Sequence, residues 1–414
     1  HGDANDHNVL VSPLDGEGDE GRRVIGLVDF GDSTRSYTCA EAAIAGAYAM
    51  LGQSDPLAAA SEVVRGYHRA FPLLEAEIAA LFPLMGLRLC ASVAIAAHHK
   101  RREPENDYLR VSEAPAWDLL DWMSSESLDL PHFLFRQACD MEPVPISSAV
   151  VDWLRAAGSG AAPVVGLDLR TIPLHVFDLS IESGEFGVSP DPEDPEAWTD
   201  AIFGRMEATG AKVGVGRYDE ARRWYTPAAF RGQGWHAPEW RTLHIGIDLM
   251  VEAGSAIYAP FEAVVHSVDN NEGSLDYGPT VILEHRVRVP ADHGPAQVPD
   301  RALEQGGPDA PLVFHTLYGH LADDVLSTLT PGQEIAKGEA FAHVGSFPTN
   351  GNWVPHLHLQ VITDLLGMEG TFPGVCRPSQ REVWKALSPD PNLILGIPDG
   401  EDGRETSRPG RPSG

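Results

Sequence analysis

Two short stretches, HIGIDL starting at His244 and PHLHLQ ending at Gln360, alternate polar with apolar residues. Alternation with period two is typical of a β-strand with one buried face. It places His244 and Asp248 on one face of the first strand, and His356 and His358 on one face of the second. Two such strands lying side by side would bring two imidazoles and a carboxylate within reach of one cation.

Two histidines and one aspartate are typical of a catalytic rather than a structural zinc, because they leave one tetrahedral position open. Water in that position is activated, since zinc lowers its pKa from ~15.7 to about 7. The segment LYGHL adds His320, and a histidine that does not bind the metal can accept a proton or stabilise a charged oxygen. A single histidine is more often a surface or core residue, but HxxxD, YGHL and HxH together favour a zinc site.

These three segments resemble those of the lysostaphin/LytM-type zinc metallopeptidases, which cut short peptide cross-links, often in bacterial cell walls. The resemblance covers about residues 216–370. It implies three zinc ligands, His244, Asp248 and His358. It also implies two catalytic histidines that do not bind the metal, His320 and His356.

The residues around the second histidine pair differ from the family pattern. The family usually has a Gly/Ser/Thr-rich turn before HxH and Phe-Glu after it. This chain reads FPTNGNWVPHLHLQ, with Trp353 before the pair and Leu359 and Gln360 after it. The motif therefore predicts the metal chemistry and leaves open whether the substrate is a peptide or a small amine.

The composition restricts the partners and the compartment. The 414 residues carry a formal net charge of −30, which argues against nucleic acid and anionic membranes, because binding phosphate requires basic residues. Four widely spaced cysteines without a CxxC pair predict free thiols in a reducing compartment. No signal peptide is visible, and the longest apolar run, Leu84 to Ala97, is too short to span a bilayer. We therefore predict a cytoplasmic protein.

A second set of motifs lies at the start of the chain, where HGDANDHNVLV is followed by VIGLVDFGD. Asp3, Asn8 and Asp29 have the chemistry and spacing of phosphoryl transfer, with one carboxylate for the attacking hydroxyl and an Asn–Asp pair for magnesium. The segment resembles the aminoglycoside phosphotransferase and choline-kinase-like family, including the hydroxylysine kinases. The resemblance implies Asp3 as catalytic base and Asn8 and Asp29 as Mg²⁺ ligands in an ATP-dependent reaction.

This kinase-like part contains only a lower lobe. No glycine-rich loop or strand lysine precedes His1, so we expect little kinase activity and a chain that is a piece of a longer protein. Apolar residues at three- and four-residue spacing predict helices over 38–51, 57–70 and 73–99, which suit such a lobe.

The chain is thus predicted to be a multidomain α+β protein, with a mostly α-helical kinase-like lobe before an antiparallel β-rich metallopeptidase domain. VVGLDL and HVFDLS, which start at Val164 and His175, are predicted strands, and the end from Asp399 is predicted to be disordered. The expected parts are a partial kinase-like lobe, an adapter, the zinc domain and a tail or linker, over residues 1–125, 126–215, 216–395 and 396–414.

This order of parts resembles bacterial fusions of a kinase-like domain, a LytM-like domain and a pyridoxal-phosphate aminotransferase. SPDPNLILGIP at 388–398 is similar to the junction before the third part, so an aminotransferase domain is expected in a longer parent protein. Three functions stay open: a zinc hydrolase, a small-molecule kinase of which this chain holds one lobe, and a zinc-containing binding or scaffolding module.

Overall fold

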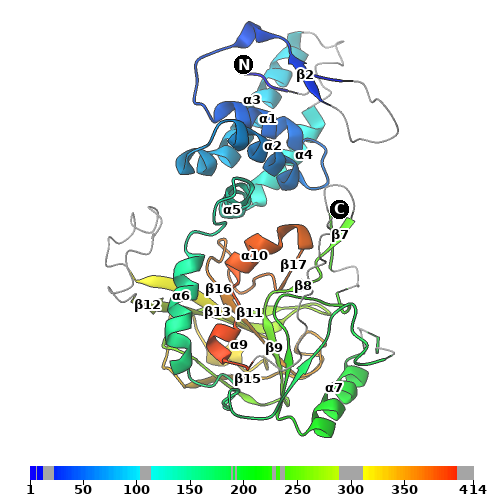
Figure 1. Ribbon diagram of the computed structural model, residues 1–414, viewed down its shortest axis with the longest axis vertical. Helices are drawn as coiled ribbons and strands as arrows, with labels where there is room; N and C mark the ends of the chain where they lie inside the picture. The colour runs from blue at the N-terminus through cyan, green and yellow to red at the C-terminus, as the bar shows by residue number, and fades with distance from the viewer. Residues whose placement is uncertain are drawn as a thin grey trace, which may run out of the picture.

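The computed structural model contains a helical unit and a β-rich unit, one above the other in Figure 1. The structure describes residues 1–5, 7–12, 23–102, 113–187, 190–191, 194–225, 230–233, 238–288 and 311–398. The predicted disordered end from Asp399 lies outside these residues.

Among the described residues, five helices form the first unit and share one apolar core. They are α1 (Ala40–Met50), α2 (Pro56–Ala70), α3 (Glu75–Arg102), α4 (Glu113–Ser125) and α5 (Asp129–Ala138). A hairpin precedes them, made of β1 (Val9–Val11) and β2 (Val24–Leu27) and followed by η1 (Phe30–Asp32). Helix α2 begins at Pro56, which suits a first helical turn, and the Asp55 carboxylate accepts a hydrogen bond from Ala58 N–H.

Helix α3 is long and apolar enough, by length and composition, to cross a membrane, and it is the one such helix in the part of the chain that was described. Its inward side contributes a stripe to the core of the bundle, made of Ile78, Leu81, Met85 and Leu89. A core helix of a bundle has the same kind of stripe.

An eight-stranded sheet forms the centre of the second unit, in the order β14-β11-β12-β13-β16-β9-β4-β3. These strands are β3 (Leu174–Phe177), β4 (Val213–Gly216), β9 (Ile247–Met250), β11 (Ala263–Asn271), β12 (Gly278–Val287), β13 (Leu312–Gly319), β14 (Glu334–Ile335) and β16 (Leu357–Ile362). All neighbours are antiparallel except β3 and β4. The predicted α+β architecture with an antiparallel β-rich domain is therefore confirmed.

Three smaller sheets complete this unit. They pair β10 (Ala256–Tyr258) with β15 (Ala340–His343), β6 (Arg231–Gln233) with β7 (Pro238–Trp240), and β8 (Leu243–His244) with both β5 (Glu220–Ala221) and β17 (Val375–Cys376). The remaining helices are α6 (Ser147–Ala157), η3 (Gly158–Gly160), α7 (Pro195–Thr209), α9 (Val325–Thr328), η5 (Pro378–Gln380), α10 (Arg381–Leu387) and α11 (Asn392–Leu395).

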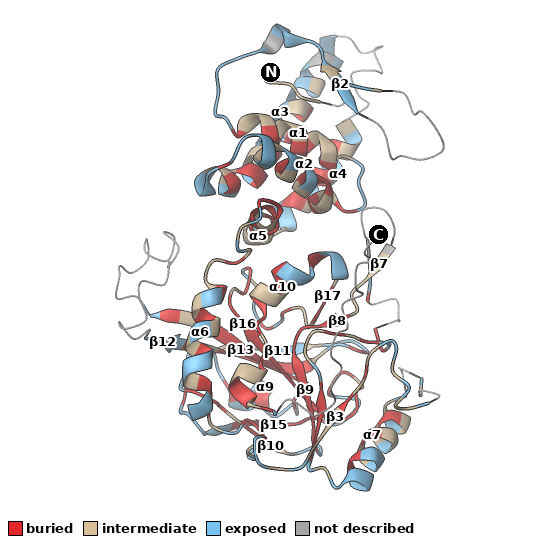
Figure 2. Ribbon diagram, in the orientation of Figure 1, coloured by how far each residue is buried: buried red, intermediate tan, exposed pale blue. Residues whose placement is uncertain are grey.

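Every residue of the central strand β16 is buried (red in Figure 2), so both of its faces are covered, whereas the alternation predicted one buried face. On one face Leu357, Leu359 and Val361 belong to a core that also contains residues of α6, α9 and α11. On the other face Ile362 belongs to a core with α10 and the helical unit. The polar residues of β16 therefore lie inside the protein.

The predicted strand from His244 to Leu249 is interrupted. Leu243 and His244 form β8 in the small sheet, while Ile247 begins β9 in the large sheet. The chain changes sheets at Ile245 and Gly246. The side chains of His244 and Asp248 nevertheless meet, with Nε2 and Oδ1 3.3 Å apart. Asp248 is also paired with His358 of β16, so the change of sheet does not separate the three side chains.

The predicted adapter contributes to both units. Helix α5 packs in the helical core, whereas α6 and the paired strands β3 and β4 belong to the β-rich unit. HVFDLS covers all of β3 except Leu174, as predicted, but the prediction of a strand over VVGLDL is wrong, because that segment forms turns. Gly166 has a φ of +70° there, which ends any extended run. Val164 and Val165 are both buried, so the apolar run reflects burial in the core and not a strand.

The two units share a continuous apolar core. Helix α5 faces α10 across the boundary in Figure 1, and side chains of both units lie in one buried cluster. Arg377 Nη1 also donates to Asp55 Oδ2 across this boundary, at 2.8 Å. Asp55 thus caps α2 and joins the helical unit to the β-rich unit.

Candidate metal centre

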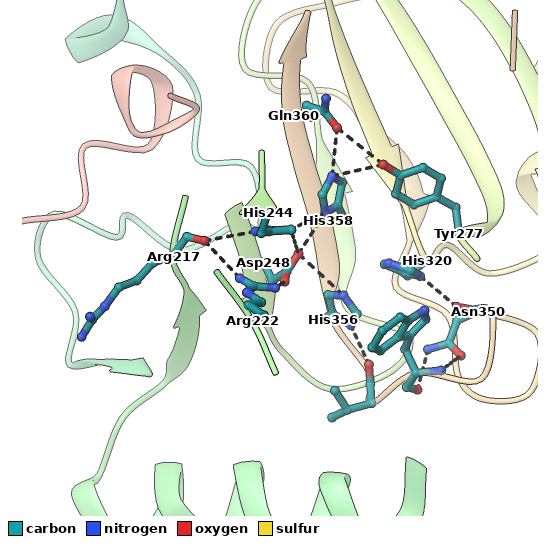
Figure 3. A network of polar contacts seen from close by, with 12 residues as sticks. Arg217, Arg222, His244, Asp248, Tyr277, His320, Asn350, His356, His358 and Gln360 are labelled. Atoms are coloured by element: carbon teal, nitrogen blue, oxygen red, sulfur yellow. Dashed lines mark hydrogen bonds and ion pairs between the residues drawn. The ribbon is translucent and has the colours of Figure 1, made fainter. Parts of the chain in front are cut away.

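Three side-chain atoms converge at one point between β8, β9 and β16 (Figure 3). His358 Nδ1 lies 3.0 Å from both His244 Nε2 and Asp248 Oδ1, and the last two atoms are 3.3 Å apart. Ligands at the usual zinc distances in a tetrahedron are about 3.4 Å from one another. The three atoms therefore fit zinc with only a small outward shift. All three residues are buried.

Strand register sets this convergence. His358 of β16 pairs directly with Asp248 of β9, so their side chains project from neighbouring positions on one face. Gly246 then leaves space for the imidazole, because a Cβ there would lie 2.5 Å from His358 Cε1. Any larger residue at Gly246 would push against the ring of His358.

One hydrogen bond to the backbone orients the ring of His244. His244 Nδ1 donates to the carbonyl oxygen of Arg217 at 3.0 Å, which leaves Nε2 free to bind a cation. Burial, helped by the charge of Arg222, lowers the pKa of His244 to about 4. His244 is therefore neutral at pH 7, which is the form that binds metals.

Arg222 is a fully buried cation beside this centre. Its Nη1 donates to Asp248 Oδ2, and its Nε donates to Glu220 Oε2 at 3.0 Å. Burial alone would raise the pKa of Asp248, but His244 and Arg222 hold it well below its usual range. Asp248 is thus ionised, with one oxygen paired to Arg222 and the other directed at the two histidines.

His320 and His356 lie beside the three converging residues, with ring centroids 4.3 Å apart. His320 Nδ1 donates to the carbonyl of Asn350 at 2.9 Å, and His356 Nδ1 donates to that of Val354 at 2.7 Å. Burial lowers the pKa of both. Both rings therefore carry their proton on Nδ1 and leave Nε2 as an acceptor. His356 Nε2 lies 3.7 Å from Asp248 Oδ1.

A cavity of about 500 Å³ opens onto all five residues. Its apolar walls are mostly aromatic, with Trp224, Tyr225, Phe230, Tyr277, Trp353 and Phe372. Trp353, which differs from the family pattern, has its ring centroid 5.9 Å from that of His320. A cavity of this size, with apolar walls and a few polar groups, is typical of a site for a compact ligand.

The kinase-like residues form a separate cluster in the helical unit. Asp3 Oδ1 pairs with Arg88, and Asp3 Oδ2 accepts from Asn8 Nδ2 at 3.1 Å. Asp29 is exposed, has a φ of +61°, and makes no hydrogen bond to Asp3 or Asn8 within the described residues. The structure thus brings two of the three predicted residues together.

Sequence reasoning missed two residues of the metal centre. Arg222 could have been found, because Glu220 and Arg222 at alternate positions place opposite charges on one strand face. Tyr277, whose hydroxyl lies 3.5 Å from His358 Nε2, carries no signal of its own in the sequence. Its place depends on Gly319 and Gly374, where a Cβ would lie within 2.5 Å of its side chain.

The kinase-like part of the chain is similar to hydroxylysine kinases, although no family model matches the chain. The Bos taurus protein is 37% identical over 125 residues, which cover 30% of this chain and 33% of that protein. The Danio rerio protein is 38% identical over 113 residues, which cover 27% and 31%. The chain spans about a third of the length of these curated relatives.

Solved peptidases of the lysostaphin type are among the structural matches. The catalytic domain of lysostaphin from Staphylococcus simulans has 18% identity and a TM-score of 0.22, covering 37% of this chain and 80% of that chain. A zinc-containing peptidase from Vibrio cholerae has 20% identity and a TM-score of 0.19, covering 29% and 27%.

Proposed function

We propose that the β-rich unit is a zinc-dependent amide hydrolase of the metallo-endopeptidase type. One observation carries the proposal: His244 Nε2, His358 Nδ1 and Asp248 Oδ1 converge at zinc spacing on the floor of a cavity. Two further histidines with acceptor nitrogens flank the same point. A structural zinc has four protein ligands and needs neither an open cavity nor uncoordinated bases.

Bound at these three atoms, zinc would supply a Lewis acid and an activated water. His356 Nε2, the closer of the two spare nitrogens to the Asp248 carboxylate, would accept the proton of the attacking water and return it to the leaving amine nitrogen. His320 Nε2 is an acceptor in the neutral ring, so it would take up a proton from solvent before it could donate to the oxygen that becomes charged. The hydrogen bonds from Nδ1 to the carbonyls of Asn350 and Val354 hold both rings in place for these transfers.

The expected substrate is a peptide or a small amine derivative in the cytoplasm. The aromatic walls favour a compact apolar group next to the amide bond. Nucleic acids and membranes are not proposed as partners, because the chain carries a net charge of −30.

Metal analysis of the purified protein, combined with a screen of glycine-rich and D-amino-acid peptides, tests this function. We expect one zinc per chain, hydrolysis of some peptides, loss of turnover on chelation and recovery on adding zinc. A protein that retains zinc, melts on chelation and cleaves nothing would instead be a scaffolding module.

A second candidate function, ATP-dependent phosphotransfer in the helical unit, is favoured by the identity to hydroxylysine kinases. Asp3 would be the base, with Asn8 and Asp29 as Mg²⁺ ligands. Asp3 is already paired with Arg88 and Asn8, so it would have to exchange partners before accepting a proton. We expect little activity from this chain, and an assay of ATP-dependent phosphorylation of hydroxylysine well above background would contradict that expectation.

A further inference from the structure

Gln360 links the central histidine of the metal centre to the backbone beyond it. Gln360 Oε1 lies 3.1 Å from His358 Nε2, the ring nitrogen that points away from the other two ligands. Gln360 Nε2 lies 3.1 Å from the carbonyl oxygen of Pro373 and 2.7 Å from Ser388 Oγ. Gln360 and Ser388 are both fully buried, so these groups depend on one another for hydrogen bonds.

The chemistry of the partners fixes the direction of every bond in this chain. The carbonyl of Pro373 can only accept, so the amide nitrogen of Gln360 must face it. A reversed amide would place two oxygens in contact. Gln360 Oε1 therefore faces His358, and because this oxygen only accepts, His358 must carry its proton on Nε2.

The proton on Nε2 decides what the other nitrogen can do. A neutral imidazole has one N–H and one lone pair, so a proton on Nε2 leaves the lone pair on Nδ1. His358 Nδ1 is the atom that lies 3.0 Å from both His244 Nε2 and Asp248 Oδ1. The opposite tautomer would direct an N–H at the place where a cation must bind.

We infer that Gln360 is a positioning residue that holds His358 in its metal-binding tautomer. This inference rests on the proposed metal site but not on any hydrolytic activity. Ser388 follows helix α10, so the end of that helix takes part in positioning the ligand. Tyr277 Oη, 3.5 Å from Gln360 Oε1, provides a second donor to the same oxygen.

Three variants separate this role from general packing. Gln360→Leu keeps the approximate shape and removes the hydrogen bonds. Gln360→Glu keeps an acceptor for His358 Nε2 but replaces the amide nitrogen that donates to the carbonyl of Pro373 with an oxygen. Gln380→Leu is the matched control, because it also removes a buried amide, whose Oε1 accepts from Trp384 Nε1 at 3.1 Å, away from the metal centre.

Two measurements are made on each variant. Long-range ¹H–¹⁵N spectra of the metal-free, histidine-labelled protein report the tautomer of His358, which is assigned by its loss in His358→Ala. Competition with a chelator reports the affinity for Zn²⁺. We expect the Nε2–H tautomer in the unsubstituted protein. In Gln360→Leu we expect a mixture of tautomers and a 10- to 100-fold weaker zinc affinity, which is the usual effect of losing such a partner.

The Gln360→Glu variant should keep the tautomer and bind zinc at least as tightly as the unsubstituted protein, and Gln380→Leu should leave zinc affinity unchanged. Finding the Nδ1–H tautomer of His358 in the unsubstituted protein would overturn the inference. This measurement needs no variant, so the inference can be tested even if Gln360→Leu does not fold. Equal losses of affinity in Gln360→Leu and Gln380→Leu would also overturn it. A protein that binds zinc and cleaves nothing would end the hydrolase proposal and leave this inference standing.

Discussion

The metal centre and the Asp3 cluster are both polar, but the structure holds them in different ways. His244, Asp248 and His358 lie on hydrogen-bonded strands, and all three are buried. Asp3 is held by partners from a loop and from α3, and Arg88 and Asp3 are each 23% exposed in their side chains. A site built on strand register is complete before any ligand arrives, whereas the Asp3 cluster is closed by its own ion pair.

The largest expected effect in this comparison comes from Asp248→Ala. It removes a proposed zinc ligand and leaves the buried charge of Arg222 without its nearest partner, which should lower the free energy of unfolding by about 3–5 kcal/mol. Zinc content and urea unfolding measure both losses. Asp324→Ala is the control, since that exposed carboxylate pairs with His343 and should cost under about 1 kcal/mol. A stable Asp248→Ala variant that still binds zinc would contradict the claim that the metal centre is held more tightly than the Asp3 cluster.

Substitution of the spare histidines should separate chemistry from metal binding. His356→Ala and His320→Ala are each expected to lower the rate of peptide hydrolysis by about 10²–10⁴-fold, because each removes a group that transfers or stabilises charge. Both variants should retain zinc, since neither ring supplies one of the three converging atoms. Loss of zinc from His356→Ala would instead make it a ligand.

Acid should destabilise the metal-free β-rich unit. Burial lowers the pKa of both His244 and His285 to about 4, whereas in the unfolded chain histidine titrates near ~6.5. Between these values the unfolded state binds more protons, so this stability is fully present above about pH 6.5 and is lost as the pH falls towards 4. Each group contributes up to about 3 kcal/mol.

Urea unfolding at several pH values, followed by a signal of the β-rich unit, checks this prediction. His285→Gln should flatten the pH dependence, because glutamine does not titrate. Equal stability at pH 5 and pH 7 would show that the buried histidines are charged in the folded protein.

The smallest expected effect comes from Arg88→Ala in the helical unit. The ion pair with Asp3 is partly exposed to water, so its loss should cost no more than about 1 kcal/mol. Zinc content should stay unchanged, because the pair lies in the other unit. A loss similar to that in Asp248→Ala would mean that the Asp3 cluster is as tightly built as the metal centre.

Local patterns predicted the parts of the site that depend on periodicity. The alternation in HIGIDL and PHLHLQ places His358 opposite Asp248 once the strands pair, and they do pair. The alternation could not show that β8 and β9 belong to different sheets. The change of sheet occurs at Gly246, which lies against His358, a residue 112 positions away in the sequence. Burial of both faces of β16 depends equally on distant elements, namely α10 and the helical unit.

Strands β3 and β4 lie at the end of the large sheet, and β4 covers the edge of β9, the strand that carries Asp248. A shortened protein beginning after Gly216 would therefore present the backbone N–H and C=O groups of β9 to solvent. Uncovered edges of this kind pair with other chains, so such a protein should self-associate and come out of solution. Boundaries for expressing the β-rich unit alone should be placed before Leu174.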